Sequence, residues 1–159
     1  MFIAPQASFN RPGNTTQYTA NDLVANDVDA ADVVPLKFDT SRIANRGKIV
    51  AVRLFTDNQV VTVASFNLHI FRTLPVAGAG DNAAYAVASV RDLLATVALD
   101  LSSGATASAT DKMERVALSV PIVFAGPMEV GAIYGLLQAV GAYTPASAEL
   151  FEATLEIEG

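Results

Sequence analysis

The residue types that most often carry catalysis or bind metals are scarce in this chain of 159 residues. It contains one histidine, His69, and no cysteine. A Ser-His-Asp site would need the fold to bring Asp and Ser to that histidine, and no G-x-S-x-G turn is present to hold a nucleophile. A zinc ion needs three or four protein ligands, mostly nitrogen or sulfur. We therefore interpret His69 as a structural or surface residue and expect no ordinary zinc site.

Two further segments have some of the residue types of ligand sites. Asp27, Asp29 and Asp32 offer carboxylates to a hard cation, but the segment lacks the glycine and the distant glutamate of a calcium loop. Gly78 and Gly80 resemble part of a dinucleotide fingerprint, without its third glycine or its strand-to-helix context. We interpret the first segment as a turn-forming acidic loop and the second as a flexible hairpin connection.

Two sets of charged side chains could face a partner. They are an acidic row near the end of the sequence and a basic group around a predicted turn: Glu152, Glu156 and Glu158, and Arg42, Arg46 and Lys48. Paired carboxylates that hydrolyse glycosides are defined by their separation in space, so a hydrolase stays open at this point. We interpret the acidic row as facing solvent or basic groups of a partner. The basic group is a solvated loop that could contact an acidic partner.

Alternating apolar and polar residues predict strands through most of the chain. The clearest case is residues 149–158, where Phe151, Ala153, Leu155 and Ile157 share one face. The other candidate strands are 15–19, 33–42, 47–57, 65–74, 93–101, 113–124 and 132–140. Short strands joined by turn residues, with no long helix between them, predict an all-β sandwich or barrel of about eight strands. The one helix candidate, 19–26, is a single turn at most.

The N-terminal segment, residues 1–14, shows little periodicity and contains two prolines and a glycine. We therefore expect an extended N-terminal arm, followed by a single β-sandwich domain over residues 15–159. Phe2, Ile3 and Phe9 have no evident core to join in this arm. We expect the arm to fold over a neighbouring subunit.

The composition limits the kinds of partner. The chain is 52% hydrophobic and 16% charged, against a usual charged share of roughly 25%, which argues against disorder and for apolar surface covered by another molecule. The net charge is −6, which argues against broad binding to nucleic acid. The apolar stretch 116–140 is interrupted by prolines, glycines and a glutamate, and the start of the chain has no basic segment. We expect a soluble protein made in a cytoplasm, with no membrane partner.

Both ends of the sequence resemble a group of small virion proteins of tailed bacteriophages. The resemblance rests on "FNRPGNTTQYTANDLVAN" (9–26), on "VVTVASFNLHIFRTLP" (60–75) and on "IYGLLQAVGAYTPASAELFEATLEIE" (133–158). It implies a capsid decoration, or cement, protein with a jelly-roll-like antiparallel β-sandwich. Such a protein occupies the outer surface of the head, binds the major capsid protein and forms a dimer or trimer. The host bacterial cytoplasm is where it is made. The resemblance transfers no catalytic residue and no cofactor.

The predicted function is therefore structural, and its partner-binding residues come from the arm, the basic turn and the acidic row. They are Phe2, Ile3, Phe9, Arg11, Arg42, Arg46, Glu152 and Glu156. The alternative is a carbohydrate-binding or tail-associated virion module involved in host adsorption. Sugar sites commonly use exposed aromatic side chains, and the candidates are Tyr18, Tyr85, Tyr134 and Tyr143.

Overall fold

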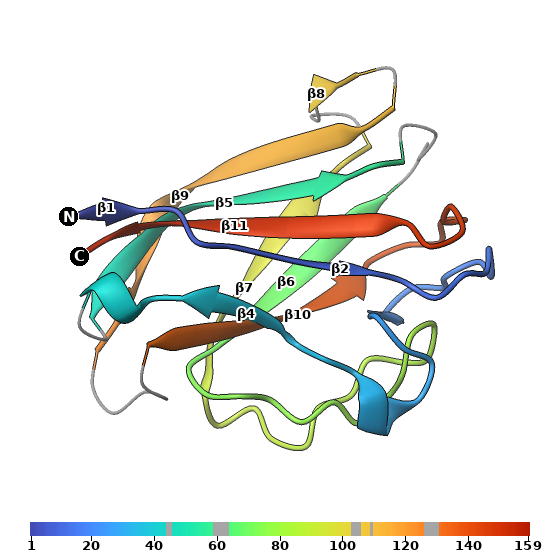
Figure 1. The fold of residues 1–159 in the computed structure, drawn as a ribbon, viewed down its shortest axis with the longest axis horizontal. Coiled ribbons are helices and arrows are strands. Elements are labelled where there is room, and N and C mark those ends of the chain that lie inside the picture. Colours follow the sequence, from blue (N-terminus) through green and yellow to red (C-terminus); the bar gives the residue numbers. More distant parts are fainter. Residues whose placement is uncertain (44–45, 59–63, 103–105, 109, 126–130) are drawn as a thin grey trace.

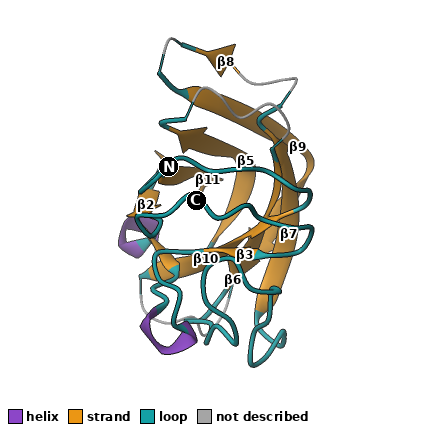
Figure 2. Ribbon diagram, turned by 90° about the vertical axis from the view of Figure 1, so that its right-hand side faces the viewer, coloured by secondary structure: helices purple, strands orange, loops and turns teal. Residues whose placement is uncertain are grey.

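Two antiparallel β-sheets face each other in the computed structural model, which describes residues 1–43, 46–58, 64–102, 106–108, 110–125 and 131–159 (Figures 1 and 2). The first sheet contains, in spatial order, β1 (Phe2–Ile3), β11 (Leu150–Glu158), β5 (Gly47–Thr56), β9 (Lys112–Phe124) and β8 (Thr106–Ala107), and β2 (Gln6–Asn10) also pairs with β11. The second contains β3 (Leu23–Val24), β10 (Ala132–Ala139), β6 (Ser65–Phe71) and β7 (Leu93–Asp100), and β4 (Leu36–Asp39) also pairs with β10. Two short 3-10 helices, η1 (Ala30–Asp32) and η2 (Ser41–Ile43), lie in the connections. Within the described ranges, no helix has the length and apolar character to cross a membrane.

The eight longer strands pair from the two ends of the chain inward. Strand β2 pairs with β11, β4 with β10, β5 with β9 and β6 with β7. The first of these eight strands therefore pairs with the last, the second with the seventh, the third with the sixth and the fourth with the fifth. This nested antiparallel pairing is that of a jelly roll. The predicted fold class is confirmed, and seven of the predicted segments contain the strands from β4 to β11 other than the short β8.

The core forms between the inward faces of the two sheets. On β11 the alternation holds as predicted, with Phe151, Ala153, Leu155 and Ile157 all buried. Strand β6 contributes Phe66 from the opposite sheet, whose ring meets that of Phe151 edge to face at 5.4 Å between centroids. Aromatic pairs in this arrangement add about 0.5–1.5 kcal/mol to the effect of buried area alone. The hydrophobic pattern of the sequence therefore decides which face of each strand is inside.

The N-terminal segment is extended, as expected, but it belongs to the sandwich. Residues of β1 and β2 pair with β11 of the same chain, in the registers Phe2 with Glu158 and Phe9 with Phe151. Ile3 is buried in the main core, and the ring of Phe9 stacks on that of Phe151 at 5.8 Å. The expectation that these two side chains lack a core is wrong, because β11 offers an edge for them to pair with. Phe2 alone stays exposed.

The segment predicted as a strand at 15–19 and a helical turn at 19–26 takes a different form. Tyr18 makes only an isolated bridge to Tyr143, and the chain then turns into the short strand β3. Asn21 adopts a φ of 75°, and the Asp22 carboxylate accepts a hydrogen bond from the backbone N–H of Thr19 at 2.6 Å. Asparagine tolerates this left-handed conformation, and an aspartate bonded back to the backbone stabilises a turn.

Strand β9 forms a long edge of the first sheet. Its inner side pairs with β5, but Val50 of β5 lies opposite residues 118–121, so the ladder contains a wide bulge. Beyond the two residues that pair with β8, no strand of the described residues covers its outer side. Pro121 lies inside the bulge, where the absence of an N–H group costs no ladder bond.

Gly80 lies where the backbone of one loop touches that of another. A Cβ atom at this position would be 1.9 Å from the Val28 carbonyl oxygen. The predicted interpretation of residues 78–82 as a flexible connection is therefore wrong. The glycine instead allows close packing that anchors the loop.

We expect Gly80→Ala to lower the free energy of unfolding by about 3 kcal/mol or more, since the added methyl group overlaps backbone atoms that cannot rotate away. Urea unfolding followed by circular dichroism measures this effect. Gly141→Ala is the matched control, because a Cβ at Gly141 meets no atom within 4 Å. Its unfolding free energy should change by no more than about 0.5 kcal/mol. Equal effects in the two variants would contradict the proposed contact.

Candidate interaction surfaces

The largest group of polar side chains is buried and centred on Arg11. Its guanidinium donates from Nη2 to Asp81 Oδ2 at 3.0 Å and from Nε to the Tyr18 hydroxyl at 2.9 Å, and both side chains of the ion pair are 0% exposed. The Tyr18 hydroxyl in turn donates to Asp81, and burial raises the pKa of Tyr18 well above its ordinary value. Asp81 also accepts the backbone N–H of Ala25 at 3.0 Å. The charges are satisfied within the chain, so this group is a structural link.

Glu149 is the centre of a second buried group. Its carboxylate accepts hydrogen bonds from Thr56 Oγ1 at 2.5 Å, from Asn58 Nδ2 at 3.2 Å and from the backbone N–H of Ala146 at 3.0 Å. Burial raises the pKa of Glu149, and the hydrogen bonds oppose this rise. Tyr143 contacts the same carboxylate and stacks on Tyr18 at 5.1 Å, so the two buried groups adjoin. The Glu149 carboxylate joins loops, and a substrate cannot reach it because it is buried.

His69 is held by its neighbours on the outer face of the second sheet. Its Nε2 lies 3.0 Å from Gln138 Oε1 and its Nδ1 lies 2.9 Å from Thr96 Oγ1. Because the amide oxygen only accepts, Nε2 carries the proton and Nδ1 accepts from the threonine hydroxyl. Burial lowers the pKa of His69, and the ring stacks on Tyr85 at 4.3 Å. A structural role, as predicted, fits these contacts.

The acidic row of the closing strand does not face solvent as a unit. Glu156 is almost completely buried, and its carboxylate accepts from Arg53 Nε at 2.7 Å and from Arg115 Nε at 2.8 Å. The two arginines come from β5 and β9 and pair with each other in register, beside β11. Their hydrogen bonds to Glu156 lower its pKa to about 2. The prediction that Glu156 meets a partner is therefore wrong, because Arg53 on the adjacent strand β5 and Arg115 on the next strand, β9, cover it.

The acidic loop around η1 is ordered by its own side chains. Asp27 Oδ1 accepts from the backbone N–H of Asp29 at 2.9 Å, and Asp29 Oδ1 accepts from that of Ala31 at 3.0 Å. The interpretation as a turn-forming loop is confirmed. Among the residues that the structure describes, no group of three His, Cys, Asp or Glu side chains is placed to hold a metal ion.

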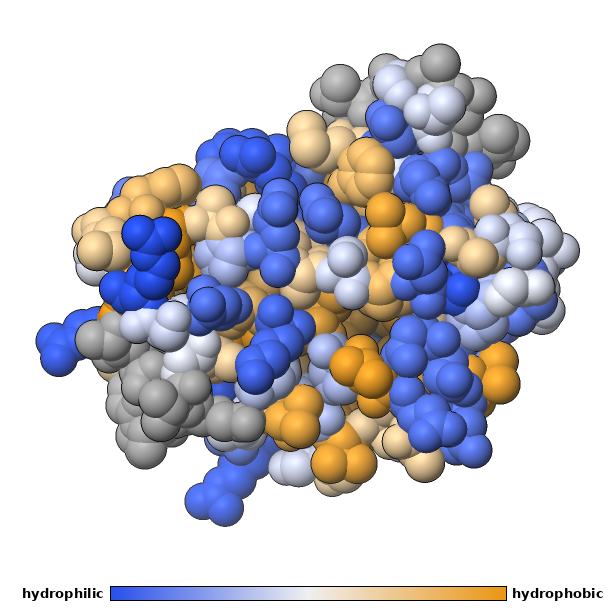
Figure 3. Space-filling model, viewed as in Figure 1, coloured by the Kyte–Doolittle hydropathy of each residue, from blue (hydrophilic) through white to orange (hydrophobic). Residues whose placement is uncertain are grey.

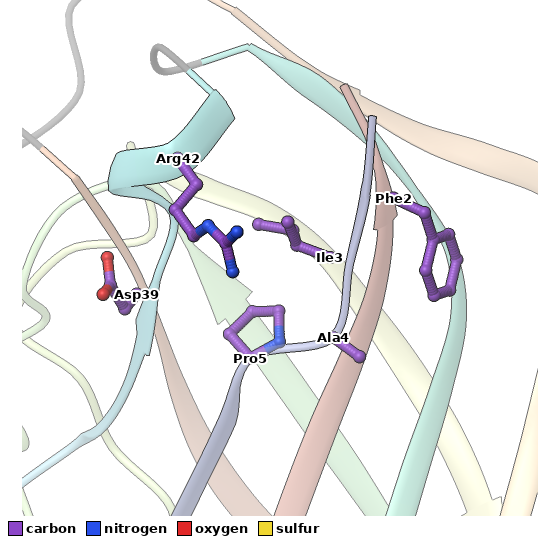
Figure 4. A pocket seen from close by; sticks show the side chains of 6 residues that line it. All are labelled: Phe2, Ile3, Ala4, Pro5, Asp39 and Arg42. Atoms are coloured by element: carbon purple, nitrogen blue, oxygen red, sulfur yellow. The ribbon is translucent and has the colours of Figure 1, made fainter.

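A pocket of about 350 Å³ opens beside β1 and η2 and brings three of the predicted partner-binding residues together. Figure 4 shows Ile3 and Pro5 pointing toward the guanidinium of Arg42, with Phe2 on the other side of β1. The Asp39 carboxylate, at the same site, accepts the backbone N–H of Ser41 at 2.9 Å. Hydrogen bonds from the Ser41 side chain and backbone lower the pKa of Asp39. We call this site the basic pocket.

A second exposed surface is apolar and lies beside the acidic loop. Leu74, Pro75 and Val76 form one wall of a shallow pocket of about 280 Å³ whose other wall is residues 30–35. Val76 is 66% exposed, and Leu74 is more than half exposed. We call these three residues the apolar ridge. Figure 3 shows hydrophobic and hydrophilic side chains side by side over the lower part of this face of the molecule.

The predicted partner-binding residues divide into three groups. Phe2, Ile3 and Arg42 line the basic pocket, and Arg46 is exposed on the turn that follows η2. Phe9 and Glu152 are half-buried, and both lie toward the other end of β11. Arg11 and Glu156 are buried in ion pairs of this chain, so they are corrected from partner-binding to structural residues. Alternation in sequence assigns a face to a strand residue, but it does not show which side chains of neighbouring strands cover that face.

The four tyrosines considered for sugar binding are mostly inside the molecule. Tyr18, Tyr134 and Tyr143 are buried, and Tyr85 is half-buried against His69. Three of the four therefore have no free ring face to offer a sugar. The apolar ridge, which sequence reasoning missed, carries no periodic signal because it lies in a connection rather than a strand.

We expect Asp81→Asn to lower the free energy of unfolding by about 3 kcal/mol, because it leaves the Arg11 charge buried without a counter-ion. Urea unfolding at pH 7 measures the loss. Asp32→Asn makes the same chemical change at an exposed carboxylate and should change the unfolding free energy by no more than about 0.5 kcal/mol. A small effect at Asp81 would mean that Arg11 reaches solvent.

The Glu156 cluster should give the protein a defined acid sensitivity. The pKa of Glu156 is about 2 in the folded chain, against an ordinary value of 4.5. The ionised carboxylate therefore makes its full contribution to the stability of the folded state above pH 4.5. That contribution is lost as the pH falls toward 2, where both states bind the proton. We expect Glu156→Gln to cost about 1 kcal/mol at pH 7, since both arginines are almost half exposed and screened by solvent.

Unfolding free energies measured from pH 7 to pH 2 test this expectation. The wild-type protein should lose more stability than Glu156→Gln between pH 4.5 and pH 2. Glu152→Gln removes a charge from the same strand outside the cluster and controls for net charge. Parallel pH curves for the wild type and Glu156→Gln would rule out the cluster as the cause.

Comparison with solved structures finds a chain from a full particle of Israeli acute paralysis virus heated to 63 degrees. The two share 10% sequence identity at a TM-score of 0.36, and the match covers 98% of this chain and 67% of that chain. A likeness this distant supports no inference about function, so the assignment of a jelly roll rests on the strand pairing. No protein-family model matches the chain. The search of curated proteins gives no match either.

Proposed function

We propose that this protein is a non-enzymatic structural protein of a virion, which binds the outside of a phage icosahedral head and stabilises contacts between major capsid subunits. The observation that carries the proposal is a jelly roll whose outer surface carries exposed apolar side chains, among them Leu74 and Val76. Jelly rolls recur in viral capsid and lectin domains. Because fold alone does not define function, the proposal depends on this surface and on the resemblance of the sequence to phage virion proteins.

The polar side chains support a structural role. Arg11, Asp81 and Glu149 are buried in groups that join loops, and Glu156 is covered by two arginines. His69 is engaged through both ring nitrogens. A general acid or base must reach the proton that it transfers, and these groups already have partners within the chain.

The apolar ridge is the surface that we assign to the shell. Leu74 and Val76 project from the connection after β6, while Pro75 between them is buried. Burying the two exposed side chains against a capsid subunit would favour binding by about 25 cal/mol per Å² of apolar surface removed from water. The folded protein would then be stabilised by mass action, since only its native form binds.

The alternative of a carbohydrate-binding or tail-associated module has less support. Lectins share the jelly-roll architecture, but only Tyr85 of the four tyrosines has part of its ring at the surface. A glycan array distinguishes the two functions, because the structural role predicts no specific glycan.

The test is binding of the purified protein to undecorated, expanded phage heads, followed by imaging at a resolution that separates subunits. We expect saturable density on the outer surface and greater resistance of the heads to heating. Val76→Glu should reduce occupancy at least tenfold, because it places a charge in an apolar contact. Val120→Glu, which changes a valine 78% exposed on β9, is the matched control and should bind normally. Density only on tails, or none on any part of the virion, would refute the assignment.

Deleting residues 1–12 is not a clean test of this binding. The deletion removes β1 and β2 from the first sheet and exposes Phe151, which Phe9 covers. Phe2→Ala is the better probe of the N-terminal segment, since Phe2 is exposed and its ring does not fill the core.

A further inference from the structure

The basic pocket has the features of a site for an acidic segment with an apolar tip. Arg42 projects from η2 beside the apolar side chains of Ile3 and Pro5 (Figure 4). Among the described residues, Arg42 makes no ion pair with any carboxylate within 4.0 Å. Arg46, four residues further along the chain, is also exposed. An exposed guanidinium beside an apolar wall can bind a carboxylate while the wall covers an adjacent aliphatic group.

The charges around the basic pocket remain positive when its acidic neighbours are included. Lys37, Arg42, Arg46 and Lys48 are all exposed at this end of the molecule, and Asp39 and Glu158 lie among them. The four cations outnumber these two carboxylates, and Glu158 pairs in register with Lys48 across β11 and β5. The whole chain has a net charge of −6, so the positive charge at this end is opposite in sign to that of the chain as a whole.

The acidic loop carries the complementary side chains. Val28 is 64% exposed between Asp27 and Asp29, and Asp32 is also exposed. The loop is held in one shape, because Asp81 donates its backbone N–H to the Asp27 carbonyl at 2.7 Å and Gly80 packs against the Val28 carbonyl. A loop that is already ordered loses little conformational entropy on binding.

The two surfaces lie at opposite ends of one molecule. Figure 1 shows η2, which carries Arg42, at the left end, and η1, which follows Val28 and Asp29, at the lower right. One chain therefore cannot bring its own loop to its own pocket. A contact between them requires a second copy.

We propose that copies of this chain bind one another through this pair of surfaces, with the acidic loop of one copy seated on the basic pocket of the next. Asp29 pairs with Arg42 of the neighbouring copy, and Val28 covers the half-buried Pro5. Such a contact joins different surfaces of two copies, and repetition of it closes a ring when the rotation allows. The contact does not depend on the proposed role on a head, and it can be measured without one.

Sedimentation velocity over a range of protein concentrations tests this contact. We expect the wild-type protein to associate, with a dissociation constant that rises with salt because the paired charges are near the surface. Arg42→Glu and Asp29→Arg should each raise that constant at least about tenfold. The double variant R42E/D29R exchanges the two charges and should recover association. Arg91→Glu makes the same change as Arg42→Glu at an exposed arginine away from both surfaces and should behave as the wild type does.

Two results would overturn the proposal. One is a monomer at all concentrations up to about 1 mM. The other is association that both single variants leave unchanged, or that the double variant does not recover. Arg42→Glu separates this contact from the shell contact, because it lies at the opposite end of the molecule from the apolar ridge and should lose self-association while retaining occupancy on heads. Loss of head binding with intact self-association would thus refute only the virion role.

Discussion

The buried ion pair between Arg11 and Asp81 is the interaction on which the arrangement of the connections depends. Arg11 follows β2 of the first sheet, and Asp81 lies in the long connection between β6 and β7 of the second sheet. Removing both charges from water costs several kcal/mol for each ion, which the pair and its hydrogen bonds must offset. An apolar contact at this place could stabilise the fold more than the ion pair does. The ion pair, however, forms only when the two segments are placed in one way. Tyr18 and the Ala25 amide complete the same set of hydrogen bonds.

The placement of that connection decides what the outside of the molecule offers. With Asp81 fixed, Gly80 lies against Val28, and the acidic loop has little freedom to move. The apolar ridge belongs to the same connection and lies beside that loop. The surfaces that we propose as contact sites are thus positioned by a group of buried polar residues.

The sequence was a good guide to the long strands and a poor one to the connections. Alternation in β6 and β11 identified Phe66, Leu68, Phe151 and Leu155 as core residues, because a period of two residues is a local property. The nested strand pairing could not be read in that way, since it depends on contacts between distant segments.

The errors in the predicted site have the same cause. Glu156 was assigned to an outer acidic row because nothing in its own segment indicates that Arg53 on the adjacent strand and Arg115 on the strand after it reach its carboxylate. Arg11 appeared to belong to a free arm because its counter-ion is 70 residues away in the chain. The exposed residues Phe2 and Arg42 were identified correctly as surface side chains, and the fold alone brought them to one pocket.

The uneven edge formed by β9 has a consequence for how copies of the chain avoid joining edge to edge. A straight, apolar edge strand invites the same strand of another molecule to continue the sheet, and repetition of that event produces fibrils. Here the wide bulge opposite Val50 interrupts the regular spacing of peptide groups, and Pro121 removes a donor from the same stretch. Exposed valine side chains, including Val120, are therefore tolerated at this edge. The irregular backbone beneath them pairs poorly with a strand of another molecule. The folded chain should therefore reach a higher concentration before it aggregates. This protection comes from the geometry of the backbone and needs no charged side chain at the edge.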